Sequence, residues 1–285
     1  MNMWSFWSNE FDPTGKTMQR LMLALLAVLA LLASNPTWSE TEVENIWQQR
    51  DGTAISAGLF LVNYSSKVRS SSKSETGTLI NLEDDLGLDN DDEILRIEFV
   101  TRPWPKHRFF LSYMDMDRNS TQALPKDITF DGVTFPAGLN VGSKLDVGLY
   151  RGGYTWSFLQ NDEWELGLSV GVYYIDLDMH LESVDHQIRA EDSTGEPFPM
   201  LGLSGTWLVN KDWIIRGTAE AFKIDKGNTE GDFYNVRLAG EYAVSEHLSI
   251  GAGYDLVRID AEDTNKDNKI IYDYDGAVIF LRWQF

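Results

Sequence analysis

The sequence predicts an all-β protein, an antiparallel transmembrane β-barrel of about ten strands, with eight or twelve strands as alternatives. Three observations predict this fold class. Past residue 52, hydrophobic residues alternate with a period of two, as in strands with two unlike faces. The segments are joined alternately by very short and by longer polar connections. The one long apolar run ends at residue 33, which excludes a bundle of membrane-spanning helices.

The composition narrows the function classes. The 285 residues include 44 acids, 24 bases and no cysteine, for a formal charge of −20. The lack of cysteine excludes a disulfide scaffold, thiolate catalysis and a cysteine metal site. The acidity argues against a nucleic-acid partner, because no basic surface remains to neutralise phosphates. Aromatic residues make up 12% of the chain, which argues against disorder.

Residues 1–39 have the layout of a secretory signal peptide. Lys16 and Arg20 precede an unbroken apolar run over residues 21–33, and the small-x-small triplet Thr37-Trp38-Ser39 follows. The run is shorter than the roughly 20 residues that a spanning helix needs. The alternatives are a buried core helix or an uncleaved anchor.

We expect cleavage after Ser39, with Ala33 as the alternative site and Met18 as a candidate natural start. Residues 40–52 then form a short polar lead-in on the periplasmic side, and residues 53–285 form the barrel. Export permits disulfides, so an exported chain without cysteine needs another source of stability. A closed hydrogen-bonded ladder in a bilayer supplies it.

The strand-like segments follow one another along the whole barrel region. Turn formers such as Asn161-Asp162 and Asn210-Lys211-Asp212 mark the tight connections between them. Short turns at one end and long loops at the other are typical of outer-membrane barrels, where the short turns face the periplasm. The expected strands are 53–68, 92–103, 107–118, 143–159, 163–179, 197–209, 212–225, 232–244, 247–261 and 271–285.

The fifth segment shows the alternation most clearly. From Trp164 to Tyr174 every second residue is apolar, and the residues between are Glu165, Gly167, Ser169, Gly171 and Tyr173. Its eleven residues match the length that a tilted strand needs to cross the hydrocarbon. Aromatic residues gather beside the short turns, where an interface girdle would place them. They are Trp104, Trp164, Trp207, Trp213, Trp283 and Phe285.

Two segments resist this interpretation. In the first, Leu59 and Leu61 compete with Phe60, Val62 and Tyr64 for the outer face. In the third, Asp115 and Asp117 share the parity of Phe109, Leu111 and Tyr113, and an aspartate facing lipid is costly. We therefore expect either a bulge near Tyr113 or an inward orientation of that whole set.

The last nine residues, AVIFLRWQF, resemble the C-terminal signature of Gram-negative outer-membrane proteins. In that group the chain ends in Phe after aromatic or aliphatic residues at alternate positions, which here are Ile279, Leu281, Trp283 and Phe285. The resemblance implies recognition of the last strand by the barrel-assembly machinery. It also implies the cell outer membrane as location, with membrane lipid and lipopolysaccharide as partners. The small barrels of this group are monomers, and we expect a monomer here.

The inward positions of the expected strands carry charges of both signs. Charges in a narrow interior must be paired or hydrated. The favoured interpretation is a closed, salt-bridged lumen, and a narrow path for small solutes is the alternative. The inward charges are Arg96, Glu98, Arg102, Arg151, Glu165, Arg216, Glu220, Arg237, Glu241, Asp255 and Arg282.

Two loops could bind a divalent cation. Seven of the eleven residues from Glu83 to Glu93 are acids, and leucines among them suggest that part of this loop docks on the rim. Asp263-x-Asn265-x-Asp267 resembles the start of a calcium loop but lacks Gly at the sixth position and Glu at the twelfth. A merely solvated loop is the alternative to a weak Ca²⁺ or Mg²⁺ site, and no other cofactor is expected. The candidate ligands are Glu83, Asp84, Asp85, Asp89, Asp91, Asp263, Asn265 and Asp267.

Asp115-Met116-Asp117 and Asp178-Met179-His180 superficially resemble the carboxylate and histidine pairs of the omptin barrel proteases. Carboxylates and an imidazole could activate a water. The two motifs are short and lie only two strands apart, so they do not face each other across a rim. We therefore predict no enzyme and no catalytic residues, and a structural or surface-interaction barrel with acidic extracellular loops. A solute channel is the first alternative, and a rim hydrolase the second.

Overall fold

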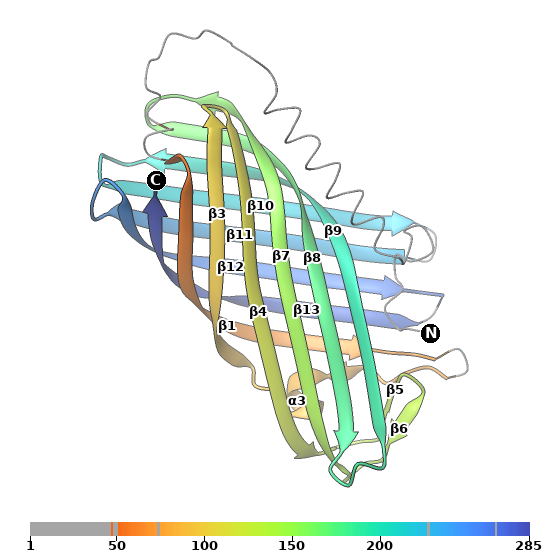
Figure 1. Ribbon diagram of the computed structural model, residues 1–285. Helices are drawn as coiled ribbons and strands as arrows, with labels where there is room; N and C mark the ends of the chain where they lie inside the picture. The colour runs from red at the N-terminus through yellow and green to blue at the C-terminus, as the bar shows by residue number, and fades with distance from the viewer. Residues whose placement is uncertain (1–46, 48–50, 73–74, 227–228, 266) are drawn as a thin grey trace.

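The computed structural model describes residues 47, 51–72, 75–226, 229–265 and 267–285. Ten long antiparallel strands pair in sequence order, and the last pairs with the first, so the sheet closes into a barrel (Figure 1). This confirms the predicted fold class. The strands are β1 (Ala54–Arg69), β3 (Asp91–Trp104), β4 (His107–Ala123), β7 (Asn140–Gln160), β8 (Trp164–Ser183), β9 (Arg189–Leu208), β10 (Trp213–Lys226), β11 (Thr229–Ala243), β12 (Leu248–Asp263) and β13 (Asn268–Gln284).

The closing pair joins residues far apart in the chain. β1 and β13 are in register from Ala54↔Gln284 to Arg69↔Lys269, and the Phe285 amide donates to the Thr53 carbonyl at 2.9 Å. The ladder therefore closes at the seam between β1 and β13. Within the part of the chain that the structure describes, no helix combines the length and the apolar character needed to cross a bilayer.

The two ends of the barrel differ. At the short-turn end, the connections are 105–106, 161–163, 209–212 and 244–247, as predicted. At the opposite, long-loop end, only 70–90 and 124–139 are long, because β8, β9, β12 and β13 run further than the sequence pattern indicated. The expected long loops 180–196, 226–231 and 262–270 are mostly strand.

The two long loops fold over the lumen. The first contains β2 (Ile80–Asn81) and α3 (Leu82–Leu86), and the second contains the hairpin of β5 (Ile128–Phe130) and β6 (Val133–Phe135). Their apolar side chains are buried against the barrel interior, so part of the acidic loop does dock on the rim, as expected. The fully buried residues are Ile80, Leu86, Ile128, Phe130 and Phe135.

An apolar belt surrounds the barrel. At the short-turn end it begins with paired rings such as Trp164 and Trp207, which stack with centroids 4.9 Å apart. At its other limit, Tyr113, Tyr150 and Tyr174 lie side by side in register on β4, β7 and β8. Tyr174 lies ten residue steps after Trp164. A strand of that length, tilted by about 40°, covers roughly 25 Å, the height of an outer-membrane hydrocarbon band.

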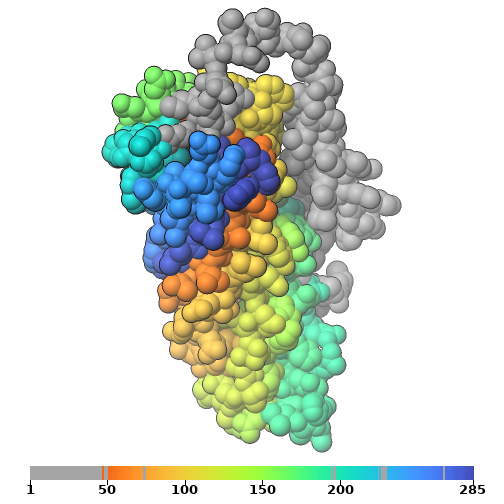
Figure 2. All heavy atoms as spheres, turned by 60° about the vertical axis from the view of Figure 1, so that its left-hand side comes forward, coloured from red at the N-terminus to blue at the C-terminus, as the bar shows by residue number. Residues whose placement is uncertain are grey.

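Four strands continue past the tyrosine row as a projecting wall, which we call the extension (β4, β7, β8 and β9 beyond Tyr113, Tyr150 and Tyr174). Figure 2 shows the residues of these strands reaching well beyond the strands of the C-terminal half. Their inner face remains apolar, with Leu145 and Met179 buried, while their outer face becomes polar. The ladder thus continues where the membrane pattern stops.

The extension corrects the prediction for the third segment. Leu111 and Tyr113 face outward, and so do the exposed Asp115 and Asp117. The β4–β7 pairing shows no register shift near Tyr113. The expected bulge and the expected inward set are both wrong, because Asp115 and Asp117 stand above the apolar belt and not in it. In β1, Leu59 and Leu61 face outward, and the competing set Phe60, Val62 and Tyr64 faces the lumen.

Inside the barrel, the long-loop half of the lumen is a packed apolar core. Large side chains from strands on opposite walls meet there, as with Tyr173 and Phe233, whose ring centroids are 4.8 Å apart. Met116, Phe60 and Phe233 are almost completely buried. The short-turn half is instead occupied by charged and hydroxylated side chains, which form the candidate site.

A charged side chain in the middle of the apolar belt should lower the free energy of unfolding far more than one on the extension. We expect Leu168→Arg to lower the free energy of unfolding by about 2–4 kcal/mol, because Leu168 lies midway between Trp164 and Tyr174 and is half exposed to lipid. Ser193→Arg, on the outer face of β9 in the extension, is the matched control and should change it by less than about 0.5 kcal/mol. Urea titration in lipid vesicles measures both, and equal losses would contradict the position of the belt.

Candidate functional site

All eleven charges that the sequence placed inside the barrel lie on its inner face. Eight are buried, and Glu98, Arg216 and Arg237 are partly buried. The structure gathers them into two groups at different depths. Each group contains long-range ion pairs between strands that are distant in the sequence.

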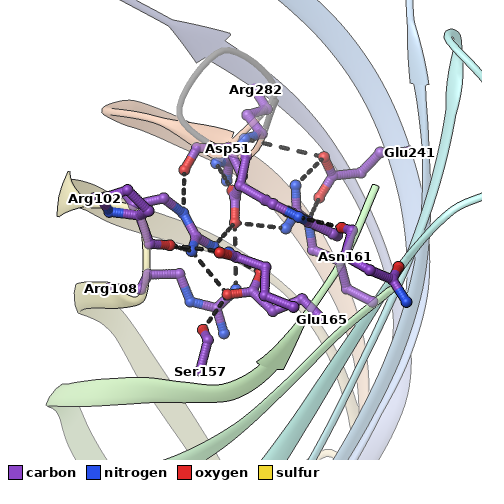
Figure 3. A network of polar contacts seen from close by, with 12 residues as sticks. Asp51, Arg102, Arg108, Ser157, Asn161, Glu165, Glu241 and Arg282 are labelled. Carbon is purple, nitrogen blue, oxygen red and sulfur yellow. Dashed lines mark hydrogen bonds and ion pairs between the residues drawn. The ribbon is translucent and has the colours of Figure 1, made fainter. Parts of the chain in front are cut away.

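The group nearest the short turns centres on a residue that strand periodicity did not single out. Asp51 is 1% exposed, and its carboxylate lies among four arginine side chains (Figure 3). Oδ1 is 2.7 Å from Arg282 Nη2, and Oδ2 is 2.9 Å from both Arg102 Nη2 and Arg216 Nη1. Arg108 Nη1 lies at 3.5 Å. We call this set the arginine cage.

Two further carboxylates share the cage arginines. Glu165 accepts two hydrogen bonds from Arg102, at 2.7 and 2.8 Å, and a third from the Ser157 hydroxyl. Glu241 accepts from Arg216 Nε at 2.8 Å. The arginines are thus held in place by fixed acceptors on β8 and β11, and Asp51 meets a preorganised cluster of donors.

The lead-in segment carries Asp51 into the barrel mouth. Trp47 is 1% exposed and packs on Leu208 and Ile214, and its indole Nε1 donates to the Asn161 carbonyl at 2.7 Å. Arg102 Nε donates to the Asp51 carbonyl at 3.1 Å. The described residues of the expected polar lead-in are therefore docked inside the wall at the short-turn end.

The cage determines the ionisation of Asp51. Burial alone would raise its pKa, but the four arginine charges outweigh burial and hold the pKa far below the ordinary value. Asp51 therefore remains a carboxylate throughout the physiological range.

The second group, which we call the mid-lumen belt, lies deeper. Arg151 pairs with Glu220, and Arg96 pairs with Asp255. Arg237 bridges Asp255 and Glu98, at 3.0 Å to each. The Arg151 guanidinium also lies 4.0 Å from the Phe110 ring centroid, where a cation–π contact forms. The belt crosses the lumen directly below the apolar core.

A chamber of about 100 Å³ lies between the arginine cage and the mid-lumen belt. Charged side chains of both groups line it, among them the carboxylates of Asp51, Glu98, Glu220 and Glu241, and hydroxyl and apolar side chains complete the lining. The hydroxyl side chains include Thr155, Ser169, Ser204, Thr206 and Thr218, and the apolar side chains include Val100, Phe110, Val278 and Phe280.

The candidate cation ligands of the acidic loop have protein partners. Glu83 pairs with Arg118 at 2.6 Å, and Asp85 with Lys126 at 2.7 Å. Asp84 accepts from the side-chain amide of Asn81 at 2.6 Å. Asp89 meets Arg118 through its backbone carbonyl, and Asp91 is an exposed first residue of β3.

The candidates in the second loop are likewise engaged. Asp267 pairs with Arg69 at 2.6 Å, and Asp263 accepts from the Asn265 amide at 3.0 Å. Among the residues that the structure describes, no three acids or histidines are grouped so that they could hold a metal ion. The structure does not bring the two loops together as one ligand set, and cation binding stays a prediction.

The residues that resemble the omptin pairs lie on the outer wall of the extension. Asp117 and Asp178 both flank Asp146 on β7, in register, and Asp178 is exposed. His180 lies 3.6 Å from Glu191 and 3.7 Å from Glu182. The two motifs therefore share one outer surface and do not face each other across the lumen.

The terminal residues lie on the outside of the closing strand. Ile279, Leu281 and Trp283 are about half exposed, and Phe285 is 73% exposed. They line the outer face of β13 beside β1 and are accessible from outside the barrel.

The fold has solved counterparts. No protein-family model matches the chain, and no curated protein matches it. The outer membrane protease OmpT from Escherichia coli matches with a TM-score of 0.52 and 13% identity, over 82% of this chain and 97% of that chain. At this identity the likeness shows a shared barrel fold and no activity.

Two further matches are looser. Ail, the attachment invasion locus protein of Yersinia pestis, matches with a TM-score of 0.34 and 11% identity, over 80% of this chain and 97% of that one. The toluene transporter TodX of P. putida matches with a TM-score of 0.35 and 10% identity, over 85% of this chain and 93% of that one.

Removing the charge of Asp51 should strongly destabilise the barrel. We expect Asp51→Asn to lower the free energy of unfolding by about 3 kcal/mol, because buried arginines lose their shared counter-charge. Asp162→Asn, in an exposed turn, should leave it unchanged. Chemical denaturation in vesicles measures both, and a neutral Asp51→Asn would contradict the importance of the cage.

The same pair of proteins gives a pH test. Because the folded pKa of Asp51 is depressed, its contribution is complete above the unfolded value and is lost as the pH falls. The stability difference between wild type and Asp51→Asn should be constant from about pH 8 to pH 5 and shrink below about pH 4. A difference that changes between pH 7 and 5 would contradict the assignment.

Proposed function

We propose that this chain is a monomeric outer-membrane barrel of a Gram-negative envelope, exported by a cleaved signal peptide. Its lumen is closed, and it acts through its surfaces. The short-turn end faces the periplasm and the extension faces outward. The apolar belt bounded by tryptophan and tyrosine rows supports insertion in a bilayer. The signal peptide lies outside the described residues, so this part rests on the sequence pattern.

The observation that carries the closed lumen is its occlusion at successive depths. The arginine cage with Trp47 fills the periplasmic mouth, the mid-lumen belt crosses the middle, and the apolar core fills the outer half. The loops with α3 and the β5–β6 hairpin cover the top. A continuous water path would require more than one of these layers to move.

The surface that remains for interaction is acidic. Outward-facing aspartates stand directly above the tyrosine row, at the level where lipid headgroups begin. Lys144 lies among these aspartates, and its Nζ is 2.7 Å from Asp146 Oδ2. Lipopolysaccharide is proposed as a neighbour because the barrel is placed in the outer membrane, and these carboxylates would meet its phosphates through bridging divalent cations. The aspartates are Asp115, Asp117, Asp146, Asp176 and Asp178.

We also propose that the terminal residues Ile279, Leu281, Trp283 and Phe285 are read by the barrel-assembly machinery. Their exposure on the closing strand supports this role. The proposal is limited to biogenesis and implies nothing about the finished protein.

Conductance separates the closed barrel from the channel alternative. We expect no steady single-channel steps for wild type in planar bilayers, with an open general porin in the same bilayer as positive control. Asp51→Asn should also remain silent, because the apolar core still blocks the lumen. Repeated steps that change with Arg282→Ala or Glu241→Ala would favour a channel instead.

Hydrolysis provides a separate test. We expect no turnover of a dibasic peptide or of lipid A by the refolded protein, because Asp117, Asp178 and His180 lie on the outer wall with no facing partner set. Chromatography of the reaction mixture measures product. Turnover that His180→Ala abolishes, and that His247→Ala in a short turn retains, would establish an enzyme.

A further inference from the structure

The described charges of the short-turn half of the lumen do not balance. The cage, its two acceptors and the mid-lumen belt contain seven guanidinium groups: Arg96, Arg102, Arg108, Arg151, Arg216, Arg237 and Arg282. They contain six carboxylates: Asp51, Glu98, Glu165, Glu220, Glu241 and Asp255. Among the described residues of this region, one positive charge is therefore left without a carboxylate. An uncompensated buried charge is costly, so this excess calls for a counter-ion.

The excess is localised at Arg108. Among the described residues, its one ion pair is the 3.5 Å contact with Asp51, whose carboxylate is already held at 2.7–2.9 Å by three other arginines. Every other arginine of the seven has a carboxylate oxygen within 3.0 Å. Arg108 also lines the chamber.

Hydroxyl groups with no protein partner surround the same space. Thr155 Oγ1, Ser169 Oγ and Thr218 Oγ1 are buried and form no hydrogen bond within the described structure. Thr155 and Ser169 are 2% and 6% exposed. Arg108 is the direct cross-strand neighbour of Thr155 on β7, which in turn neighbours Ser169 on β8. Arg108, Thr155 and Ser169 therefore occupy neighbouring inward positions on three adjacent strands.

Glycine keeps the space around these hydroxyls open. A Cβ at Gly167 would lie 2.6 Å from Thr155 Cγ2 and 2.9 Å from Ser204 Oγ, and one at Gly202 would lie 2.9 Å from Ser169 Oγ. A larger residue at either position would push the hydroxyls aside. The strands opposite contribute Val100, Phe110, Val278 and Phe280, together with charged side chains of the cage and the mid-lumen belt.

We propose that the chamber binds one small inorganic anion of single charge, of the size class of chloride or nitrate. Arg108 supplies the charge, and the hydroxyls of Thr155 and Ser169 donate hydrogen bonds. One negative charge neutralises the lumen, and about 100 Å³ has room for only a few water-sized particles. The ion is a structural ligand that holds the arginine cage and the mid-lumen belt in their relative positions.

Bromide is the probe, because it scatters X-rays anomalously and resembles chloride. The full chain is refolded in bromide, so the ion equilibrates before the lumen closes. We expect an anomalous peak in the chamber within hydrogen-bonding distance of Arg108 and Thr155. No peak in the chamber would overturn the proposal.

A solution measurement is made with the same protein. Bromide replaces gluconate, an anion too large for the chamber, at constant ionic strength, and the urea midpoint is followed in vesicles. Binding to the folded state alone should raise stability progressively with bromide concentration. Thr155→Val should weaken apparent bromide affinity roughly tenfold, and Arg108→Gln should abolish the dependence.

Arg189→Gln is the matched control, since it removes a positive charge at an exposed position of the extension. It should retain the full bromide dependence. If Arg108→Gln fails to fold, Thr155→Val and Ser169→Ala, which alter single hydroxyls, decide the question. A bromide dependence that is unchanged in both hydroxyl variants reports a surface ion effect and rejects the chamber site.

Discussion

A bilayer offers the backbone no hydrogen-bond partner, and the rest of this structure depends on that constraint. A sheet with an open edge cannot persist in hydrocarbon, so β13 must meet β1 along its whole length. Closure in turn forces the side chains to alternate between lipid and lumen. The closed ladder also gives a chain without cysteine a source of stability other than disulfide bonds.

Closure also creates the problem that the interior solves. Ten strands enclose a space that side chains must fill, and this chain fills it in two ways. Towards the loops it uses apolar side chains, as a soluble protein does. Towards the short turns it uses arginines and carboxylates whose partners come from distant strands, such as Arg96 on β3 with Asp255 on β12. These pairs join strands that are not hydrogen-bonded neighbours, and so add contacts across the lumen to those of the ladder.

The sequence was sufficient for the number and order of the long strands and for most of their faces, because lipid on one side and a narrow lumen on the other impose a period of two. The alternation was misleading at Asp115 and Asp117. The outer face becomes polar there because the strand has passed beyond the apolar belt, while its register stays the same. Asp51 could not be found in this way. It lies in a segment without periodicity, and its arginine partners come from four strands. Arg108 was missed because it follows a turn, where parity is hard to assign. The ion pairs themselves depend on barrel shear, which no local pattern encodes.

The composition of the arginine cage also sets an order of events. Its four arginines come from β3, β4, β10 and β13, that is, from both ends of the chain. The binding site for Asp51 therefore does not exist until the last strand has found the first. We therefore expect the N-terminal segment to dock only after the seam between β1 and β13 has formed.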